Sequence, residues 1–298
     1  MALVITGAGG VLGRTLIKRN KGRDIVAVSN QDIEGDTNVK VFRRDAFFES
    51  FRFSDKDQLI NCAFPMNNPD AYRLAEGLNY IGRVIAKAAD EKAGCVINIS
   101  SQSIYSQKRC TAANEQSDIK PETPYALGKY VSEIIINNLC RAIPHTNIRL
   151  ASLIGPEYES RIVNRLIKKI VRGEPLTVSV CPRLFEFLDV RDAADAILKM
   201  ADIDCNYLQE EYVLGGSAFY TLEQIVDIIQ TVYKKYNPDG FRVEKVKGDD
   251  NANNCLDSRL IYTLLNWTPK FDLKESIETI IEKEWSIDHQ SKMVENKL

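Results

Sequence analysis

The stretch Ala2-Leu-Val-Ile-Thr6-Gly7-Ala-Gly-Gly10-Val-Leu-Gly13 decides the fold of this chain. Its apolar beginning predicts a buried strand, and a helical pattern follows Gly13. Gly7 permits a tight turn, Gly10 lets the backbone approach a pyrophosphate, and Gly13 lets the helix pack closely on the strand. The helix then offers free N–H groups to phosphates. A strand before these glycines and a helix after them predict a dinucleotide-binding loop.

Outward from this loop, the first half of the chain alternates short apolar runs with helical patterns. Continuous apolar strands that alternate with helices indicate a parallel sheet covered on both faces. The predicted strands are Leu3–Thr6, Ile25–Val28, Gln58–Cys62, Cys95–Ile99 and Asn147–Ser152, and the predicted helices are Gly13–Lys21, Ala71–Lys92 and Pro124–Ala142. We therefore expect an α/β, doubly wound, Rossmann-type domain over residues 1–155.

After Gly155-Pro156, strand and helix patterns no longer alternate regularly along the sequence. We expect residues 156–298 to form a smaller, mostly α, substrate-binding region that can interleave with strands returning to the main sheet. Its predicted helices are Ser160–Gly173, Leu222–Tyr236, Leu256–Leu265 and Leu273–Trp285, and its predicted strands are Leu176–Val180 and Val243–Val246. The polar run Lys247–Asn254 predicts a surface loop, and the polar residues from Asp288 onward predict a frayed end.

Composition excludes several classes of protein. The 298 residues are 44% hydrophobic and 27% charged, as in a soluble globular protein. A net charge of −2 without a basic block argues against nucleic-acid binding, and no apolar run is long enough for a membrane span. Seven scattered cysteines and a strand that starts almost at Met1 predict reduced thiols in a cytoplasmic protein without a leader peptide. Two histidines make a metal site or a Ser-His-Asp hydrolase unexpected.

Tyr125 and Lys129 are the second chemical feature of the sequence, within Tyr125-Ala-Leu-Gly-Lys129. Positions four apart share one face of a helix, so the phenol and the ammonium are expected to project together. A neighbouring ammonium favours phenolate and lowers the pKa of a tyrosine, which suits proton exchange near neutral pH. Because an ordinary amphipathic helix carries the same spacing by chance, the meaning of the pair depends on the rest of the chain.

The residues expected at the adenosine end of the site do not decide between NAD and NADP. The strand Ile25–Val28 ends in Ser29-Asn30, where an NAD-specific protein often carries an acidic residue for the ribose hydroxyls. Without that carboxylate a 2′-phosphate is not repelled, and Arg14 and the pair Arg43-Arg44 are candidate phosphate partners. Each arginine is equally well explained as a solvated surface charge, so both NAD and NADP remain candidates.

The glycine loop together with Tyr125-x-x-x-Lys129 resembles the extended short-chain dehydrogenase/reductase family. Within it, the chain is most similar to the NAD-dependent epimerase/dehydratase subgroup of nucleotide-sugar epimerases. The other segments that carry the resemblance span nearly the whole chain: Arg44-Asp45-Ala46, Ile60-Asn-Cys-Ala63, Asn79-Tyr-Ile-Gly82, Asn98-Ile-Ser-Ser101-Gln-Ser-Ile-Tyr105, Arg149 to Gly155-Pro156, Leu188-Asp-Val-Arg-Asp192-Ala and Leu265-Asn-Trp267-Thr-Pro269.

The resemblance implies a catalytic set. Ser101 would hydrogen-bond the substrate oxygen, Tyr125 would give or take its proton, and Lys129 would hold the nicotinamide ribose. Ser101 can also be read as a strand-end serine that caps a turn, and Ser100 is the alternative if the register shifts by one. The implied cofactor-binding residues are Gly7, Gly10, Val11, Leu12, Gly13, Arg14, Ser29, Asn30, Asp45, Ala46, Cys62, Ala63, Asn79, Ser100, Tyr125, Lys129 and Ile154.

Several residues differ from the family pattern, and these differences bear on which substrate the protein can bind. Gln102-Ser103 replaces the acidic pair of sugar 4,6-dehydratases, so a dehydratase is not favoured. Ser152 stands where the epimerases commonly have an asparagine, and Phe185 where they have a diphosphate-binding arginine. A guanidinium fork matches a diphosphate, so nearby arginines can compensate, although each can also be a surface charge. The candidate substrate residues are Gln102, Ser152, Arg161, Arg183 and Arg259.

We therefore expect an NAD(P)-dependent oxidoreductase or epimerase that acts on a sugar, most simply a sugar nucleotide. The alternatives are a carbonyl or keto-sugar reductase whose substrate lacks a nucleotide diphosphate, and a cofactor-binding regulator without turnover. In the family the helices that correspond to Ala71–Lys92 and Pro124–Ala142 pair across a two-fold axis, which implies a homodimer. Residues Val131, Ile134, Ile135 and Leu139 would form part of that face, although core packing explains them equally well.

Overall fold

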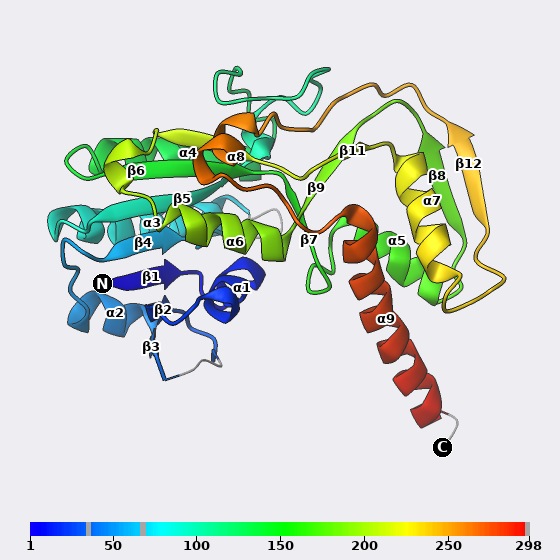
Figure 1. The fold of residues 1–298 in the computed structure, drawn as a ribbon, viewed down its shortest axis with the longest axis horizontal. Helices are drawn as coiled ribbons and strands as arrows, with labels where there is room; N and C mark the ends of the chain where they lie inside the picture. Colours follow the sequence, from blue (N-terminus) through cyan, green and yellow to red (C-terminus); the bar gives the residue numbers. More distant parts are fainter. Residues whose placement is uncertain (34–36, 66–69, 296–298) are drawn as a thin grey trace.

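The computed structural model describes residues 1–33, 37–65 and 70–295 of the chain. Within these ranges, the main body is a sheet of seven strands in the order β10-β6-β5-β4-β1-β2-β3 (Figure 1). Every neighbouring pair in it is parallel, which confirms the predicted Rossmann-type fold. The strands are β1 (Ala2–Thr6), β2 (Asp24–Val28), β3 (Val39–Phe42), β4 (Gln58–Asn61), β5 (Cys95–Ser101), β6 (His145–Leu150) and β10 (Glu211–Leu214).

Helices cover both faces of this sheet, as its continuous apolar strands require. One face packs on α1 (Val11–Arg19), α6 (Val190–Met200) and α8 (Arg259–Leu265), and the other on α2 (Arg44–Ser50), α3 (Ala71–Asp90) and α4 (Pro124–Leu139). The alternation along β1 shows why. Leu3 and Ile5 enter the first core with α1 and α6, whereas Val4 enters the second core with α3.

The predicted strand Asn147–Ser152 is in fact two strands in different sheets. β6 ends at Leu150, and β7 (Ser152–Ile154) pairs with β9 (Phe185–Asp189), which also pairs with β11 (Phe219–Tyr220). Between them, the N–H of Ala151 donates to the carbonyl of Leu214 at 2.9 Å. Both segments are largely buried, so their apolar pattern runs on across the break and hides the change of sheet.

A second group of elements packs around a core of its own beside the main sheet (Figure 1). It consists of α5 (Ile162–Val171), α7 (Leu222–Tyr233), α9 (Leu273–Glu295) and the parallel pair β8 (Leu176–Val180) and β12 (Val243–Lys247). Val163, Ile229 and Ile277 are completely buried there. Two 3-10 turns, η1 (Gln102–Ile104) and η2 (Cys205–Tyr207), complete the described elements.

Some predicted boundaries are wrong. α9 continues to Glu295, so the end predicted to fray from Asp288 is helical as far as the structure describes it; its lysines, glutamates and glutamine are good helix formers. The last helix before it begins at Arg259 rather than at Leu256. Residues 248–254 lack regular structure, as predicted, but Ala252 and Asn254 are buried rather than on the surface. The sequence pattern did not indicate β3, α2, β9, α6, β10 or β11, most of which are short.

No helix in the described part of the chain combines the length and the apolar character that a membrane crossing requires. All seven cysteines carry free thiols.

Candidate active site

A cavity of about 1320 Å³ opens at the carboxyl ends of β1, β4 and β5. This is the edge at which doubly wound sheets bind their ligands. Its volume exceeds the roughly 300–1,000 Å³ that is typical of a site for one small ligand. The cavity therefore has room for a dinucleotide and a second molecule beside it.

The cavity brings together most of the predicted site. Its walls include the predicted residues Gly7, Gly10, Val11, Leu12, Gly13, Ser29, Asn30, Cys62, Ala63, Asn79, Ser100, Ser101, Gln102, Tyr125, Lys129, Ser152 and Arg161. The predicted residues that do not line it are Arg14, Arg43, Asp45, Ala46, Ile154, Arg183 and Arg259, whereas Arg44 of the predicted arginine pair does line it.

The arginines outside the cavity already have partners. Arg183 pairs with Asp250 and Arg259 with Asp257, each at 2.5 Å, away from the cavity wall. Arg14 donates to Gln31 Oε1 at 2.9 Å, and Gln31 lines the cavity. Of the arginines predicted for the substrate, Arg161 is the one that the fold brings to the cavity.

The glycine loop has the geometry that a pyrophosphate needs. Gly7 adopts a φ of +67°, and a Cβ there would lie 2.6 Å from the backbone nitrogen of Ala63. A Cβ on Gly13 would lie 2.5 Å from the carbonyl oxygen of Gly7. No side chain caps α1 at Gly10, so the N–H groups of its first turn are free to bind an anion at the cavity wall. These features fit the predicted dinucleotide cofactor.

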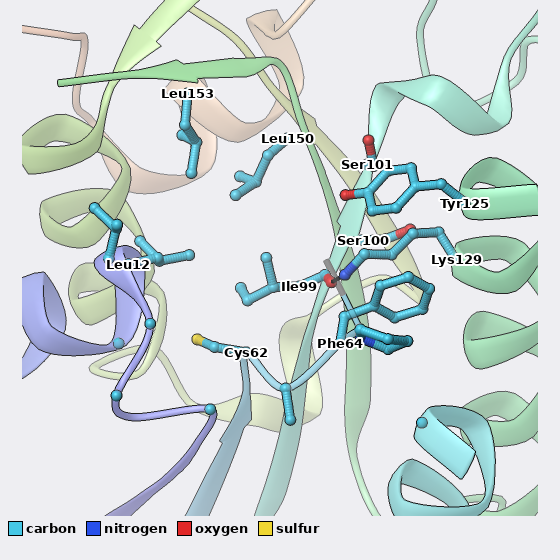
Figure 2. A pocket seen from close by; sticks show the side chains of 18 of the residues that line it. Leu12, Cys62, Phe64, Ile99, Ser100, Ser101, Tyr125, Lys129, Leu150 and Leu153 are labelled. Carbon is cyan, nitrogen blue, oxygen red and sulfur yellow. Dashed lines mark hydrogen bonds between the residues drawn. The ribbon is translucent and has the colours of Figure 1, made fainter. Parts of the chain in front are cut away.

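Ser101 and Tyr125 meet at the other end of the cavity. β5 ends at Ser101, and α4 presents Tyr125 from its first turn, where Thr123 accepts the N–H of Ala126 at 3.1 Å and Pro124 takes the first helical position. Figure 2 shows the phenol of Tyr125 beside Ser101, whose Oγ also caps η1 by accepting the N–H of Ser103 at 3.2 Å and its hydroxyl at 3.0 Å. A hydroxyl and an acid–base phenol side by side can bind and deprotonate one carbinol oxygen.

Lys129 does not point at Tyr125. Its Nζ donates to the carbonyl oxygen of Ile99 at 2.7 Å and lies 4.3 Å from the centroid of the Phe64 ring (Figure 2). Phe64 in turn meets Tyr125 edge to face, with ring centroids 5.3 Å apart. Tyr125 and Lys129 share a helix face, but both side chains contact the Phe64 ring rather than each other.

The predicted effect of Lys129 on Tyr125 is wrong in this structure. Burial raises the pKa of Tyr125, and the groups that oppose the rise are the Arg161 guanidinium and the hydrogen bond with Ser101. Burial also lowers the pKa of Lys129 to about 8. The cation that acts on the phenol is Arg161, which no spacing within α4 indicates.

The cavity also has walls that the sequence pattern did not indicate. Phe64 directly follows the predicted Ala63, so continuing that segment by one residue would have found it. Tyr158 has no such signal, because β7 and the following turn bring it to the site only after the change of sheet. The other lining residues that sequence reasoning missed include Gly9, Gln31, Pro65, Arg73, Glu76, Gly77, Tyr80, Arg83, Gln107, Glu157, Glu159 and Ser160.

Metal chemistry finds no support in the part of the chain that the structure describes. There, no three His, Cys, Asp or Glu side chains are grouped so that they could hold an ion.

Comparison with known proteins gives a consistent result. The model of the NAD dependent epimerase/dehydratase family matches residues 3–215. A Methanocaldococcus jannaschii protein provisionally named UDP-glucose 4-epimerase is 22% identical over 306 positions, which cover 94% of this chain and 97% of that protein.

Solved structures share the fold at low sequence identity. The UDP-glucuronic acid 4-epimerase of Bacillus cereus, solved with NAD, has a TM-score of 0.80 at 18% identity, over 96% of this chain and 99% of its own. The Bordetella bronchiseptica enzyme WbmH, solved with NAD+, has a TM-score of 0.78 at 16% identity, over 95% and 97%. The family match covers well over half of the sequence, and the chain therefore belongs to the NAD-dependent epimerase/dehydratase family, of the extended short-chain dehydrogenase/reductase type.

Proposed function

We propose that this protein is an NAD(P)-dependent epimerase of a nucleotide-linked sugar, with Tyr125 as its acid–base residue. The observation that carries the proposal is the pair of hydroxyls of Ser101 and Tyr125 in one cavity with the glycine loop. The relatives support it, since one is named a UDP-glucose 4-epimerase and another was solved with UDP-glucuronic acid and NAD.

Cofactor binding and proton transfer take place at two different ends of the cavity. Gly7, Gly10 and the first turn of α1 hold the pyrophosphate of the cofactor, and Ser29 and Asn30 line its adenosine end. A nicotinamide bound there would supply the acceptor for a hydride from the sugar carbon and the donor that returns it to the ketone.

Ser101 and Tyr125 act on the carbinol group of the sugar, and Tyr125 transfers its proton. Tyr125 as phenolate accepts the carbinol proton while the C–H electron pair leaves as hydride, and it returns that proton to the oxygen when the ketone is reduced. Ser101 donates a hydrogen bond to the same oxygen and holds it in place. Atoms and electrons balance over the cycle, and the only net change is the configuration at one carbon.

A keto-sugar reductase is the second candidate function. Phe185 replaces a diphosphate-binding arginine, and neither Arg183 nor Arg259 reaches the cavity, so a diphosphate lacks the usual clamp. A regulator without turnover is less well supported, because Ser101, Tyr125 and Lys129 all line the cavity.

The epimerase, the reductase and the regulator differ in whether they retain the cofactor and whether they consume it during turnover. The protein is incubated with NAD or NADP, passed through a gel-filtration column, and then given UDP-glucose or UDP-glucuronic acid. An epimerase retains its cofactor and interconverts the sugar without net change in absorbance at 340 nm. Net consumption of NADH or NADPH with a keto-sugar would instead establish the reductase, and retained cofactor without any turnover would establish the regulator. The cofactor that is retained decides between NAD and NADP.

We further propose that residues 1–155 bind the cofactor and residues 156–298 supply the substrate region, with β10, α6 and α8 lying on the main sheet. We also propose a homodimer through α3 and α4, which pack against each other on one face of that sheet.

A further inference from the structure

The end of β2 presents no carboxylate to the cavity. The three residues that follow this strand, Ser29, Asn30 and Gln31, all line the cavity, and none of them is acidic. The next residue, Asp32, is not part of the cavity wall and pairs with Arg43 at 2.6 Å. In proteins of this fold that use NAD, an Asp or Glu at this place binds the ribose hydroxyls, and its charge would repel a phosphate on O2′. The described residues at the end of β2 impose no such repulsion.

The hydroxyl of Ser29 lies directly against the glycine loop. A Cβ on Gly9 would lie 2.6 Å from Ser29 Oγ and 2.9 Å from Gln31 Oε1. Ser29 Oγ also accepts the N–H of Gln31 at 2.9 Å, and the serine is buried. These neutral polar groups therefore adjoin the loop that would hold the pyrophosphate, which is where the adenosine ribose of a dinucleotide binds.

Arg14 joins this group of residues from α1. Its Nη2 donates to Gln31 Oε1 at 2.9 Å, and the side chain of Gln31 is neutral. Across the described ranges of the chain, no carboxylate lies within the 4.0 Å of an ion pair with the Arg14 guanidinium. Its charge is therefore available to an anion that binds beside Gln31.

Arg44 joins the same segment through Asn30. The backbone N–H of Arg44 donates to Asn30 Oδ1 at 3.2 Å. The guanidinium lies over the ring of Tyr80, 4.6 Å from its centroid, and both residues line the cavity. The ring holds the guanidinium without neutralising it, and no carboxylate among the described residues forms an ion pair with it. The segment at the end of β2 is therefore bonded to two arginines whose charges are unmatched.

We propose that Arg14, Arg44 and the hydroxyl of Ser29 form a subsite for the 2′-phosphate of NADP, so that this protein prefers NADP to NAD. A 2′-phosphate adds about −1.5 to −2 of charge at pH 7, and a guanidinium binds phosphate oxygens through charge-assisted hydrogen bonds. NAD carries a hydroxyl at the same position and leaves both arginines unmatched. The preference distinguishes this chain from the similar structures that were solved with NAD. The inference rests on the cofactor binding in the proposed function and not on the epimerisation.

The test compares the affinities of NAD and NADP by calorimetry, after charcoal treatment has removed any bound nucleotide from the protein. The result does not depend on turnover. We expect the wild type to bind NADP about 10- to 100-fold more tightly than NAD. Arg44→Gln should lose most of that preference and keep its affinity for NAD within about threefold. Arg14→Gln should have the same effect, because each variant removes one of the two charges.

Arg43→Gln is the matched control. Arg43 is the neighbour of Arg44 in the sequence, but it lies outside the cavity wall and is paired with Asp32. Its replacement should change neither affinity by more than about threefold. Ser29→Asp is the converse variant, since it places a carboxylate at the end of β2. It should weaken NADP binding more than NAD binding.

Salt dependence gives a second measurement. Raising the KCl concentration from about 50 to about 300 mM should weaken NADP binding more than NAD binding in the wild type, because ions screen the attraction between the phosphate and the guanidinium groups. The difference between the two cofactors should shrink in Arg44→Gln. Equal wild-type affinities, or tighter binding of NAD, would overturn the inference. So would a preference for NADP that persists in both arginine variants, since other groups would then hold the phosphate.

The outcomes also separate this inference from the proposed function. A preference for NADP in a protein that epimerises neither UDP-glucose nor UDP-glucuronic acid would leave the subsite standing and reject the epimerase. Epimerisation by a protein that binds NAD more tightly would do the reverse. Failure to bind either dinucleotide would reject both.

Discussion

At the scale of single residues, Tyr125 occupies a site that by itself opposes its ionisation. Burial raises the pKa of the phenol, and Arg161 and Ser101 only oppose that rise. Proton exchange near neutral pH requires that the phenolate be stabilised further. Lys129 was expected to supply that stabilisation, but in this structure its ammonium donates to the carbonyl of Ile99.

Replacing Tyr125 with phenylalanine removes the acid–base group and keeps the ring that packs on Phe64. We expect the kcat of Tyr125→Phe to fall by about 10²- to 10⁴-fold, because general acid–base catalysis supplies a factor of that size. Cofactor affinity, measured by fluorescence titration, should fall far less than kcat, because the glycine loop still binds the pyrophosphate. Tyr130→Phe on the same helix, outside the cavity, is the control. A Tyr125→Phe variant with the wild-type rate would remove Tyr125 from the mechanism.

Lys129 makes stability depend on pH in a defined direction. Its pKa is about 8 in the folded protein, below the ordinary value of 10.5, so the unfolded chain binds more protons between these two values. Stability due to this group therefore rises with pH in that window. From pH 8 to 9.5 we expect a gain of roughly 1–2 kcal/mol for the wild type relative to Lys129→Met.

The comparison with Lys129→Met is necessary because cysteines that are buried in the folded protein ionise in the same pH range once the chain unfolds. Burial raises the pKa of Cys140 to about 12, so its contribution to stability falls as pH rises above the ordinary value of 9.0. Urea unfolding of both proteins at each pH isolates the contribution of Lys129. A difference that does not change with pH would show that Lys129 keeps an ordinary pKa.

At the scale of secondary-structure elements, the contact between β1 and α1 depends on a missing side chain. A Cβ on Gly13 would lie 2.5 Å from the carbonyl oxygen of Gly7, and backbone at that position cannot move without shifting the helix. Gly82 in α3 is the opposite case, since a Cβ there would meet nothing within 4 Å. The two glycines therefore respond differently to the same substitution.

We expect Gly13→Ala to weaken cofactor binding by at least about tenfold, because displacing the α1 N-terminus misplaces its N–H groups. Gly82→Ala should leave binding unchanged and raise helix stability by up to about 1 kcal/mol. Calorimetric titration with the cofactor and thermal unfolding measure these effects. Normal binding by Gly13→Ala would show that the loop does not hold the pyrophosphate.

A buried ion pair joins α4 to β6. Arg149 Nη2 lies 2.9 Å from Glu133 Oε2, both side chains are almost completely buried, and Arg149 also donates to the Tyr105 hydroxyl at 3.0 Å. Glu133→Gln leaves a buried guanidinium without its counter-charge, so we expect a loss of about 3–5 kcal/mol in the free energy of unfolding. The double variant Glu133→Leu/Arg149→Met should recover most of it. Urea unfolding tests both, and a loss below about 1 kcal/mol for Glu133→Gln would contradict a buried, paired charge.

At the scale of the whole molecule, α4 leaves apolar side chains facing solvent. Leu127, Ile134 and Leu139 are 50%, 44% and 42% exposed, and Tyr72 of the neighbouring α3 is 72% exposed. Val131 and Ile135, predicted for the same face, are half-buried. Such a patch on two adjacent helices is the kind of surface that a second copy of the chain covers.

We therefore expect light scattering to give a dimer mass for the wild type and a monomer mass for Ile134→Glu, because a charge at the centre of an apolar contact is costly. Val246→Glu changes an equally exposed apolar residue on β12 and should leave the dimer intact. A wild-type protein that is monomeric at all concentrations would reject the dimer.

Sequence reasoning predicted more of the first half of the chain than of the second. Long elements with strong periodicity, such as α3 and α4, lie where the pattern placed them. β10 was not predicted, since it has only four residues and becomes a strand by pairing with β6 along the sheet edge. The pairing partner lies more than sixty residues earlier in the chain, so no local pattern contains it.

By itself, the sequence determined the parallel sheet and the glycine turn, and its resemblance to the family implied the meeting of Ser101 with Tyr125. The sheet follows from the order of apolar strands and helices, and the turn from residues that lack a Cβ. The structure then places Ser101 at the end of β5 and Tyr125 at the start of α4. Only the tertiary structure decided that Lys129 binds the carbonyl of Ile99, and that Arg161 reaches the cavity while Arg183 and Arg259 do not. The physical reason is that a long charged side chain goes to whichever partners other elements bring within its reach, and spacing within one element does not contain those partners.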